Sequence, residues 1–315
     1  MPANWIFWLV FNLFVLAMLA LDLGVFRRHK RVVSFREALG WTVVWIGLAG
    51  IFALLIYWFG QSMVGSTRPN SQLSLEFVTG YVIEQSLSVD NLFVFLLIFR
   101  YFSVPRRFQH DVLFWGVIGA LVMRAIFILT GVTLLQRFHW VIYIFGAILV
   151  YSGFRLLRQH GAEVHPERNP LLRAFRKLFR LTEDYEGSRF FVRREAITYA
   201  TPLALVLIVV ETSDVLFAVD SIPAVLAVTR EPFIVYTSNV FAILGLRSLF
   251  FVLSGMIETF RFLHYGLSII LIFIGIKMLA SEYVQIRTEI ALLAVAGILL
   301  VSVVLSLVLP RREQP

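Results

Sequence analysis

Nine long apolar segments run through the 315-residue sequence, and they constrain its fold more than any other feature. A transmembrane helix needs roughly 20 mostly apolar residues, because that length crosses the hydrocarbon core of a bilayer. We therefore expect an all-α polytopic membrane protein with about nine transmembrane helices, forming a single transmembrane domain over residues 1–315. The expected spans cover about residues 5–26, 41–59, 76–99, 112–135, 139–157, 203–228, 233–256, 263–281 and 289–309.

The composition agrees with a membrane protein. The sequence is 59% hydrophobic and 15% charged, whereas soluble domains are about 45–50% apolar and about 25% charged. It contains no Cys, which excludes a disulfide scaffold and a Cys-ligated zinc or iron–sulfur centre. The first segment is too long for the apolar region of a signal peptide and lacks a small-residue cleavage site, so we expect it to remain as a helix.

Positive charges predict the orientation in the membrane, because Lys and Arg concentrate in cytoplasmic loops. With the N-terminus outside, most of the 28 Lys and Arg residues fall on the cytoplasmic side, and the outer loops hold only Arg68, Arg137, Arg230 and Arg287. We therefore expect a bacterial inner-membrane protein with its N-terminus outside and its C-terminus in the cytoplasm. The net charge of +8 is interpreted as contact with the lipid bilayer, and no motif indicates nucleic-acid binding.

The segment 158–199 is the only sizeable soluble part of the expected topology. Leu172, Phe175, Leu178 and Phe179 share one face of a helix whose other positions are basic. This pattern is typical of an amphipathic helix on the inner leaflet, and a solvated linker helix fits it equally well.

Spans three to five (76–157) share a pattern of polar residues with spans six to eight (203–281). A unit of three spans is odd in number, so its second copy must enter the membrane from the opposite side. Inverted repeats of this kind are a transporter architecture, with the binding site near the midplane where the copies meet. The matched pairs are Glu84 with Asp214, Asp90 with Asp220, Arg124 with Arg247, Tyr143 with Tyr265, Gly153 with Gly275 and Arg155 with Lys277.

Carboxylates inside the apolar segments are the main functional signal. A charge at the bilayer centre costs roughly 3 kcal/mol on insertion scales. Two arginines cannot neutralise the five acids nearest the midplane, so the remaining acids must be protonated or face a cation. The six acids are Asp22, Glu84, Asp90, Glu211, Asp214 and Asp220. We assign Glu84, Asp90, Asn91, Asp214, Asp220 and Ser221 as metal ligands, and Glu211, Arg124 and Arg247 to proton coupling or ion pairing.

The ligand types narrow the choice of ion. None of the six His lies in the middle of a span, and oxygen ligands suit manganese, magnesium or calcium rather than zinc or copper. On an unbroken helix Glu211 and Asp220 point in opposite directions. We therefore expect Pro223 to bend or unwind the sixth span near Asp220.

Three stretches carry a resemblance to a known family. Residues 81–95 (YVIEQSLSVDNLFVF), 211–224 (ETSDVLFAVDSIPA) and 238–248 (SNVFAILGLRS) resemble the TerC family of bacterial membrane proteins. The resemblance covers nearly the whole chain. It implies an inner-membrane manganese exporter associated with tellurite resistance and the response to alkaline pH, with Mn²⁺ as transported substrate and no permanently bound cofactor. The family's membrane acids fall here on Glu84, Asp90, Glu211, Asp214 and Asp220.

Competing functions remain open at the level of sequence. The first is export of divalent ions by alternating access, with protons as a natural coupling ion. The second is a non-transporting membrane-bound redox modulator or envelope-stress component, which the absence of Cys and of a haem-ligating His pair makes chemically hard to support. An intramembrane aspartyl hydrolase is disfavoured because no Gly-rich pattern surrounds the Asp residues, and we expect no enzyme activity.

Overall fold

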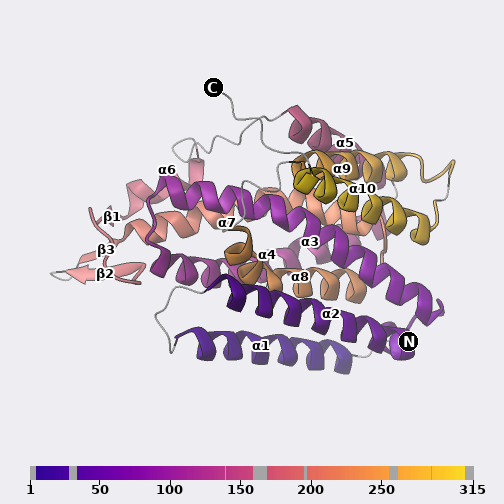
Figure 1. Cartoon of the computed structure of the whole chain (residues 1–315), viewed down its shortest axis with the longest axis horizontal. Coiled ribbons are helices and arrows are strands. Elements are labelled where there is room, and N and C mark those ends of the chain that lie inside the picture. Colours follow the sequence, from indigo (N-terminus) through magenta and orange to yellow (C-terminus); the bar gives the residue numbers. More distant parts are fainter. Residues whose placement is uncertain are drawn as a thin grey trace.

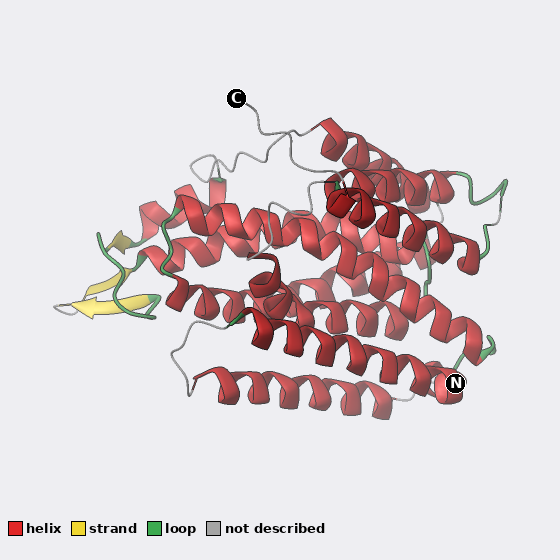
Figure 2. Ribbon diagram, in the orientation of Figure 1, coloured by secondary structure: helices red, strands yellow, loops and turns green. Residues whose placement is uncertain are grey.

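The computed structural model describes residues 5–27, 34–138, 140–158, 169–194, 197–254, 262–284 and 286–308, without the side chains of residues 22–27. The described chain is mostly helical, as expected, with one small sheet (Figures 1 and 2). Its helices are α1 (Trp5–Arg27), α2 (Phe35–Val64), α3 (Asn70–Tyr101), α4 (Arg106–Arg137), α5 (Val141–Arg158), α6 (Pro170–Leu178), α7 (Pro202–Leu226), α8 (Pro232–Ser254), α9 (Leu263–Leu279) and α10 (Thr288–Val308). The strands are β1 (Arg180–Leu181), β2 (Phe191–Arg194) and β3 (Ile197–Ala200).

Seven helices in the described part of the chain are long and apolar enough to cross a membrane: α2, α3, α4, α5, α7, α8 and α10. Two more apolar helical stretches, Trp5–Leu21 of α1 and Leu263–Leu279 of α9, are shorter. A bilayer core needs about 20 helical residues. The difference between the seven spans found and the nine expected therefore comes from these two shorter stretches. The chain is therefore a multi-pass membrane protein.

Proline and glycine mark the ends of several of these helices. Pro69 and Pro105 directly precede α3 and α4, and Pro202 and Pro232 open α7 and α8. A proline at the first helical position loses nothing, because its missing N–H would have no partner there. Helix α2 ends at Gly65, whose φ of 69° closes the last turn with a hydrogen bond to the carbonyl of Gln61. Only glycine adopts that conformation without strain.

Helix α8 lies at the centre of the bundle. In its apolar window 89% of the residues are buried, compared with 22% in α5 and in α10. It packs against α2, α3 and α4, while α7 packs against α3 and α4, and α5 packs along α9 (Figure 1). The four helices α3, α4, α7 and α8 therefore enclose a common interior.

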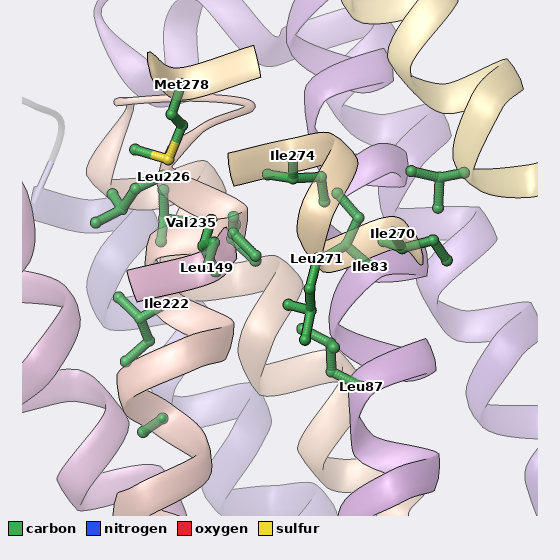
Figure 3. Packing of buried hydrophobic residues seen from close by; sticks show 14 of the residues in the cluster. Ile83, Leu87, Leu149, Ile222, Leu226, Val235, Ile270, Leu271, Ile274 and Met278 are labelled. Carbon is green, nitrogen blue, oxygen red and sulfur yellow. The ribbon is translucent and has the colours of Figure 1, made fainter. Parts of the chain in front are cut away.

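Two apolar clusters hold this arrangement together. One joins α5, α7 and α9 through residues such as Leu149, Ile222 and Ile274 (Figure 3). The other is aromatic and connects α1 and α2 to α3 and α8, with ring centroids 5.0 Å apart for Phe52 and Phe241 and 5.3 Å apart for Phe52 and Phe77. Both clusters flank the interior that the four central helices enclose.

Helices α5 and α9 approach so closely that side chains are excluded at their crossing. A Cβ atom at Gly275 would lie 2.8 Å from the carbonyl oxygen of Gly146 and 2.8 Å from the amide nitrogen of Val150. A Cβ atom at Gly153 would lie 2.8 Å from the carbonyl oxygen of Ser268 and 3.0 Å from the amide nitrogen of Ile272. Such contacts leave no room for a methyl group, so glycine is required at both positions.

Residues 169–194 and 197–200 form a small folded unit at one end of the bundle (Figure 2). Strand β3 pairs in parallel with β1 and antiparallel with β2. The Tyr185 hydroxyl donates a 2.6 Å hydrogen bond to the carbonyl of Phe102, in the turn between α3 and α4. The sequence pattern predicts a helix here, which is confirmed by α6, but it does not predict the strands.

Helix α6 uses part of its apolar face to contact the protein itself. Leu172 is buried against the bundle, Phe175 contacts Phe179 in a tilted arrangement with ring centroids 4.6 Å apart, and Phe179 contacts Phe191 of β2 at 5.6 Å. Leu178 is exposed. Contact of α6 with the inner leaflet stays a prediction, and Leu178 is the apolar residue of this helix most available for it.

Candidate functional site

A buried arginine occupies the interior between the four central helices. The Nη1 atom of Arg124 (α4) donates hydrogen bonds to Glu84 of α3, to Asn239 Oδ1 of α8 at 3.0 Å and to Ser221 Oγ of α7 at 3.3 Å. Its Nη2 atom lies 3.5 Å from Oδ1 of Asp214, also on α7. Glu84 and Asp214 lie near the middle of their helices. We call these five residues the central site.

The central site is closed off from solvent. Arg124 is 1% exposed, Glu84 0% and Asp214 4%. Moving an isolated charge out of water costs several kcal/mol even after relaxation, so charges buried this deeply must compensate one another. One guanidinium faces two carboxyl groups here, so with both ionised the three side chains carry a net charge of −1.

Several polar atoms of this region have no hydrogen-bond partner among the described residues. They include Oε2 of Glu84, Oδ2 of Asp214, Nε of Arg124, Oγ of Ser88 and Nδ2 of Asn91. Buried polar atoms in folded proteins are nearly always paired. The central site therefore has the capacity to hold a further polar or charged partner.

A polar stripe leads from the central site along α3. Glu84, Ser88 and Asn91 are spaced four and three residues apart, which places them on one helix face, and all three are buried. One turn further on, Phe95 lines a water-sized cavity that also touches Asp214. The stripe and the cavity point from the central site toward the end of the bundle that carries the sheet.

The amide of Asn239 has a fixed orientation. Its Nδ2 atom donates a 3.0 Å hydrogen bond to the carbonyl of Val235 on the same helix, which turns Oδ1 toward Arg124. The side chain thus presents an oxygen to the central site, as a ligand for a cation would.

The expected ligands Asp90 and Asp220 have other neighbours. Oδ1 of Asp90 lies 3.9 Å from Nδ1 of His264 on α9. Oδ1 of Asp220 accepts a 2.6 Å hydrogen bond from Ser152 on α5. The six expected ligands are thus divided. Glu84, Asp214 and Ser221 meet at Arg124, Asn91 is buried two turns further along α3, and Asp90 and Asp220 each face one helix of the α5–α9 crossing.

The remaining expected residues are not among the contacts of Arg124 or lie outside the description, although Glu211 is on α7 three residues before Asp214. The Glu211 carboxylate packs on Gly119 of α4, where any Cβ atom would collide with it. Arg247 is buried in α8 at 5% exposure. The side chain of Asp22 lies outside the described residues.

The expected unwinding of α7 near Asp220 is wrong, whereas a bend there stays a prediction. The helix stays continuous from Pro202 to Leu226, with Pro223 inside its last turn. Because so little helix follows Pro223, its missing N–H and its ring disturb only the end of α7. Glu211 and Asp220 consequently remain on different faces, against α4 and α5.

Across the described ranges, no group of three or more His, Asp or Glu side chains is placed to hold a metal ion. The central site offers two carboxylates and neutral oxygens instead. Any divalent ion held there would use this mixed set of oxygen ligands, which suits hard cations such as Mn²⁺ or Mg²⁺.

Sequence reasoning missed a second buried charge cluster. Glu76, near the start of α3, is 2% exposed and accepts hydrogen bonds from Arg68 at 3.1 Å, Gln72 at 3.1 Å and Thr229 at 2.5 Å. Arg68 also lies 3.9 Å from Glu231. We call these five residues the Glu76 cluster. Its signal in the sequence was an acid at the boundary of an apolar segment with a basic residue eight positions earlier.

These features define a class: a helical, multi-pass integral membrane protein with a buried, charged interior. The comparison with protein families places the chain more closely. The model described as "Integral membrane protein TerC family" matches residues 70–314. The chain belongs to the TerC family, which confirms the resemblance seen in the sequence.

Close relatives extend over almost the whole chain. A protein of Myxococcus xanthus named "Uncharacterized membrane protein STKORF319" is 48% identical over 305 residues, covering 96% of this chain and 92% of the relative. A protein of Escherichia coli (strain K12) named "Putative membrane-bound redox modulator Alx" is 46% identical over 300 residues, covering 95% and 93%. No solved structure gives a significant match.

Proposed function

We propose that the protein exports divalent metal ions, with Mn²⁺ as the preferred substrate, through the central site. The observation that carries this proposal is the pair of carboxylates of Glu84 and Asp214, buried at mid-helix with one free oxygen each. Intramembrane acids are expensive and mark ion pathways by default. The chain is expected to lie in the bacterial inner membrane with its N-terminus outside, as the Lys and Arg distribution predicts.

The chemistry of the central site fits a hard divalent ion. Two carboxylates balance the charge of one M²⁺, and Ser221 and Asn239 add neutral oxygen donors. Manganese and magnesium favour this kind of oxygen set. Asn91 lies along the polar stripe and is proposed as a ligand on the way to the central site. Asp90 and Asp220 are proposed as secondary positions that an ion meets outside the central site.

We further propose nine spans and an inverted repeat made of α3–α5 and α7–α9. Equivalent contacts at the α5–α9 crossing support it: Gly275 against Gly146 and Val150 corresponds to Gly153 against Ser268 and Ile272 when α9 is offset from α5 by 122 residues. This offset is the one that aligns Gly153 with Gly275. The crossing would then lie on the pseudo-twofold axis.

The contacts of Asp90 and Asp220 support the same symmetry. Asp90 of the first unit faces α9 of the second unit, and Asp220 of the second unit faces α5 of the first unit. In the inverted-repeat proposal, alternating access moves one unit against the other around the central site. In the expected orientation, the polar stripe would lie on the cytoplasmic side of the central site, and the Glu76 cluster would lie near the outer end of the same helix.

A redox or envelope-stress role is the second candidate, and the name of the Escherichia coli relative favours it. A redox modulator needs a redox-active group. The chain has no Cys, so such a role would require a cofactor or a partner protein. Purified protein with no redox-active absorbance and with Mn²⁺ flux would exclude this role as the primary one.

Reconstituted vesicles test the proposal directly. Wild-type protein, Glu84→Gln, Asp214→Asn and the control Glu289→Gln would be compared for ⁵⁴Mn²⁺ flux under a metal gradient. Glu289 is exposed in the first turn of α10, so its substitution removes a carboxylate without touching the central site. We expect the two central variants to lose at least about ten-fold in flux, since even outer-shell partners of metal sites contribute about 10–100-fold in affinity.

Two results would refute the proposal. One is the absence of Mn²⁺ flux in wild-type vesicles under every metal and pH gradient. The other is normal flux in both central variants, with all four proteins inserted to the same extent. Competition by Mg²⁺, Ca²⁺ and Fe²⁺ in the same assay would establish the preference for Mn²⁺.

A further inference from the structure

Arg124 contacts every strong oxygen ligand that the central site offers. Its guanidinium reaches Glu84, Asp214, Ser221 and Asn239, which come from three helices other than its own. A divalent ion bound to the same oxygens would lie within a few ångströms of the guanidinium. Two such cations repel strongly in a buried site of low dielectric. The guanidinium and the metal ion therefore exclude one another.

We propose that Arg124 is a tethered cation that takes the place of the metal ion in the empty transporter. This inference rests on the proposed function. When the metal binds, it displaces the guanidinium from the carboxylates of Glu84 and Asp214. When the metal leaves, Arg124 returns, and the empty site never carries two uncompensated buried acids.

The burial of the site explains why such a substitute is needed. An alternating-access carrier must reorient once loaded and once empty. Without a cation or bound protons, Glu84 and Asp214 would be two neighbouring negative charges at 0% and 4% exposure, a state whose cost rises steeply in a membrane interior. The covalently attached cation lowers that cost each time the empty carrier returns. Because the guanidinium competes with the metal ion for the same oxygens, metal binding is weakened as a consequence.

The proposal separates two transport modes. Net efflux requires the empty carrier to return, so it depends on Arg124. Exchange of Mn²⁺ for Mn²⁺ across the membrane uses only the loaded carrier, so it does not depend on the tethered cation. Removing the competitor should also tighten Mn²⁺ binding.

Vesicles carrying Arg124→Gln, Arg124→Lys, wild-type protein or the control Arg137→Gln test this separation. Arg137 is exposed in the last turn of α4. Net ⁵⁴Mn²⁺ efflux would be measured into metal-free buffer, and exchange would be measured with equal Mn²⁺ on both sides. For Arg124→Gln we expect net efflux to fall at least about ten-fold, exchange to stay within about three-fold of wild type, and half-saturating Mn²⁺ to fall about ten-fold, the factor set by about 1.4 kcal/mol of lost competition.

Arg124→Lys keeps the charge but cannot form the forked contacts of a guanidinium. We expect its ratio of net efflux to exchange to lie between those of wild type and Arg124→Gln. Should Arg124→Gln fail to insert, a lowered ratio in Arg124→Lys decides the matter alone. A ratio that stays at the wild-type value in the variants overturns the proposal, and so does a parallel loss of both modes, which a purely bracing role predicts.

The same assays distinguish failure of this inference from failure of the proposed function. If wild-type protein shows neither Mn²⁺ efflux nor Mn²⁺ exchange, export itself is refuted. If wild-type protein shows both modes and the variants keep the wild-type ratio, export stands and the role of Arg124 as a substitute cation is refuted.

Discussion

Gly275→Ala should destabilise the protein by forcing α5 and α9 apart. The new Cβ atom would lie 2.8 Å from the carbonyl oxygen of Gly146, and an ordinary contact of this kind begins near 3.4 Å. The helices must therefore separate by about 0.6 Å along that contact, because a backbone carbonyl, unlike a flexible side chain, cannot rotate away. Overpacking of a close-packed interior typically costs about 1–3 kcal/mol. Alanine is a better helix former than glycine, so the gain in helix propensity offsets part of this cost.

Thermal unfolding in detergent, followed by the loss of monodisperse protein, measures the effect. Gly297→Ala in α10 is the matched control, since a Cβ atom there meets nothing within 4 Å. Gly153→Ala is the symmetric counterpart, with its own 2.8 Å contact to the carbonyl of Ser268. We expect both crossing variants to unfold several degrees below the control.

Equal stability of Gly275→Ala and Gly297→Ala would refute the packing argument. A loss in only one of the crossing variants would leave the close approach in place and contradict the equivalence of the two contacts. The inverted-repeat proposal therefore gains or loses support from the same experiment, independently of any transport assay.

Two further predictions concern contacts at the ends of the bundle. Thr229→Val should lower the free energy of unfolding by about 1.5–3 kcal/mol, because it removes a hydrogen bond to the buried carboxylate of Glu76. The control Thr133→Val, on an exposed face of α4, should lower it much less. Equal unfolding temperatures of the two variants would contradict this prediction. Tyr185→Phe should cost about 0.5–1.5 kcal/mol by removing the hydrogen bond to Phe102. Burial raises the pKa of Tyr185, so this stabilisation is complete below the ordinary tyrosine pKa and is lost as the pH rises through the raised value; a difference between wild type and variant that persists unchanged into strong alkali would refute it.

The helical part of the fold was predictable because the bilayer requires long apolar runs. Each expected segment corresponds to one helix, and the charged residues Arg106 and Arg137 mark the two ends of α4 where the apolar pattern stops. The strands were not predictable in the same way. β1 is only two residues long, and its pairing with β3 depends on a contact across the intervening loop rather than on a local pattern.

The central site was predictable in its residues and not in its geometry. The cost of a buried charge singled out Glu84, Asp214 and Arg124. Helical periodicity fixes which face of its own helix a residue occupies, but it cannot tell which neighbouring helix that face meets. This is why Asp90 and Asp220, equally buried by sequence position, were grouped with the central pair and instead face His264 and Ser152.

The Glu76 cluster holds two turns together at one end of the bundle. A single carboxylate joins the turn before α3, through Arg68, to the turn before α8, through Thr229. Because those bonds share one acceptor group, loss of the Glu76 carboxylate would remove all of them at once. The link between these two turns therefore depends on one side chain, and a single substitution at Glu76 would release segments that lie about 150 residues apart in the sequence.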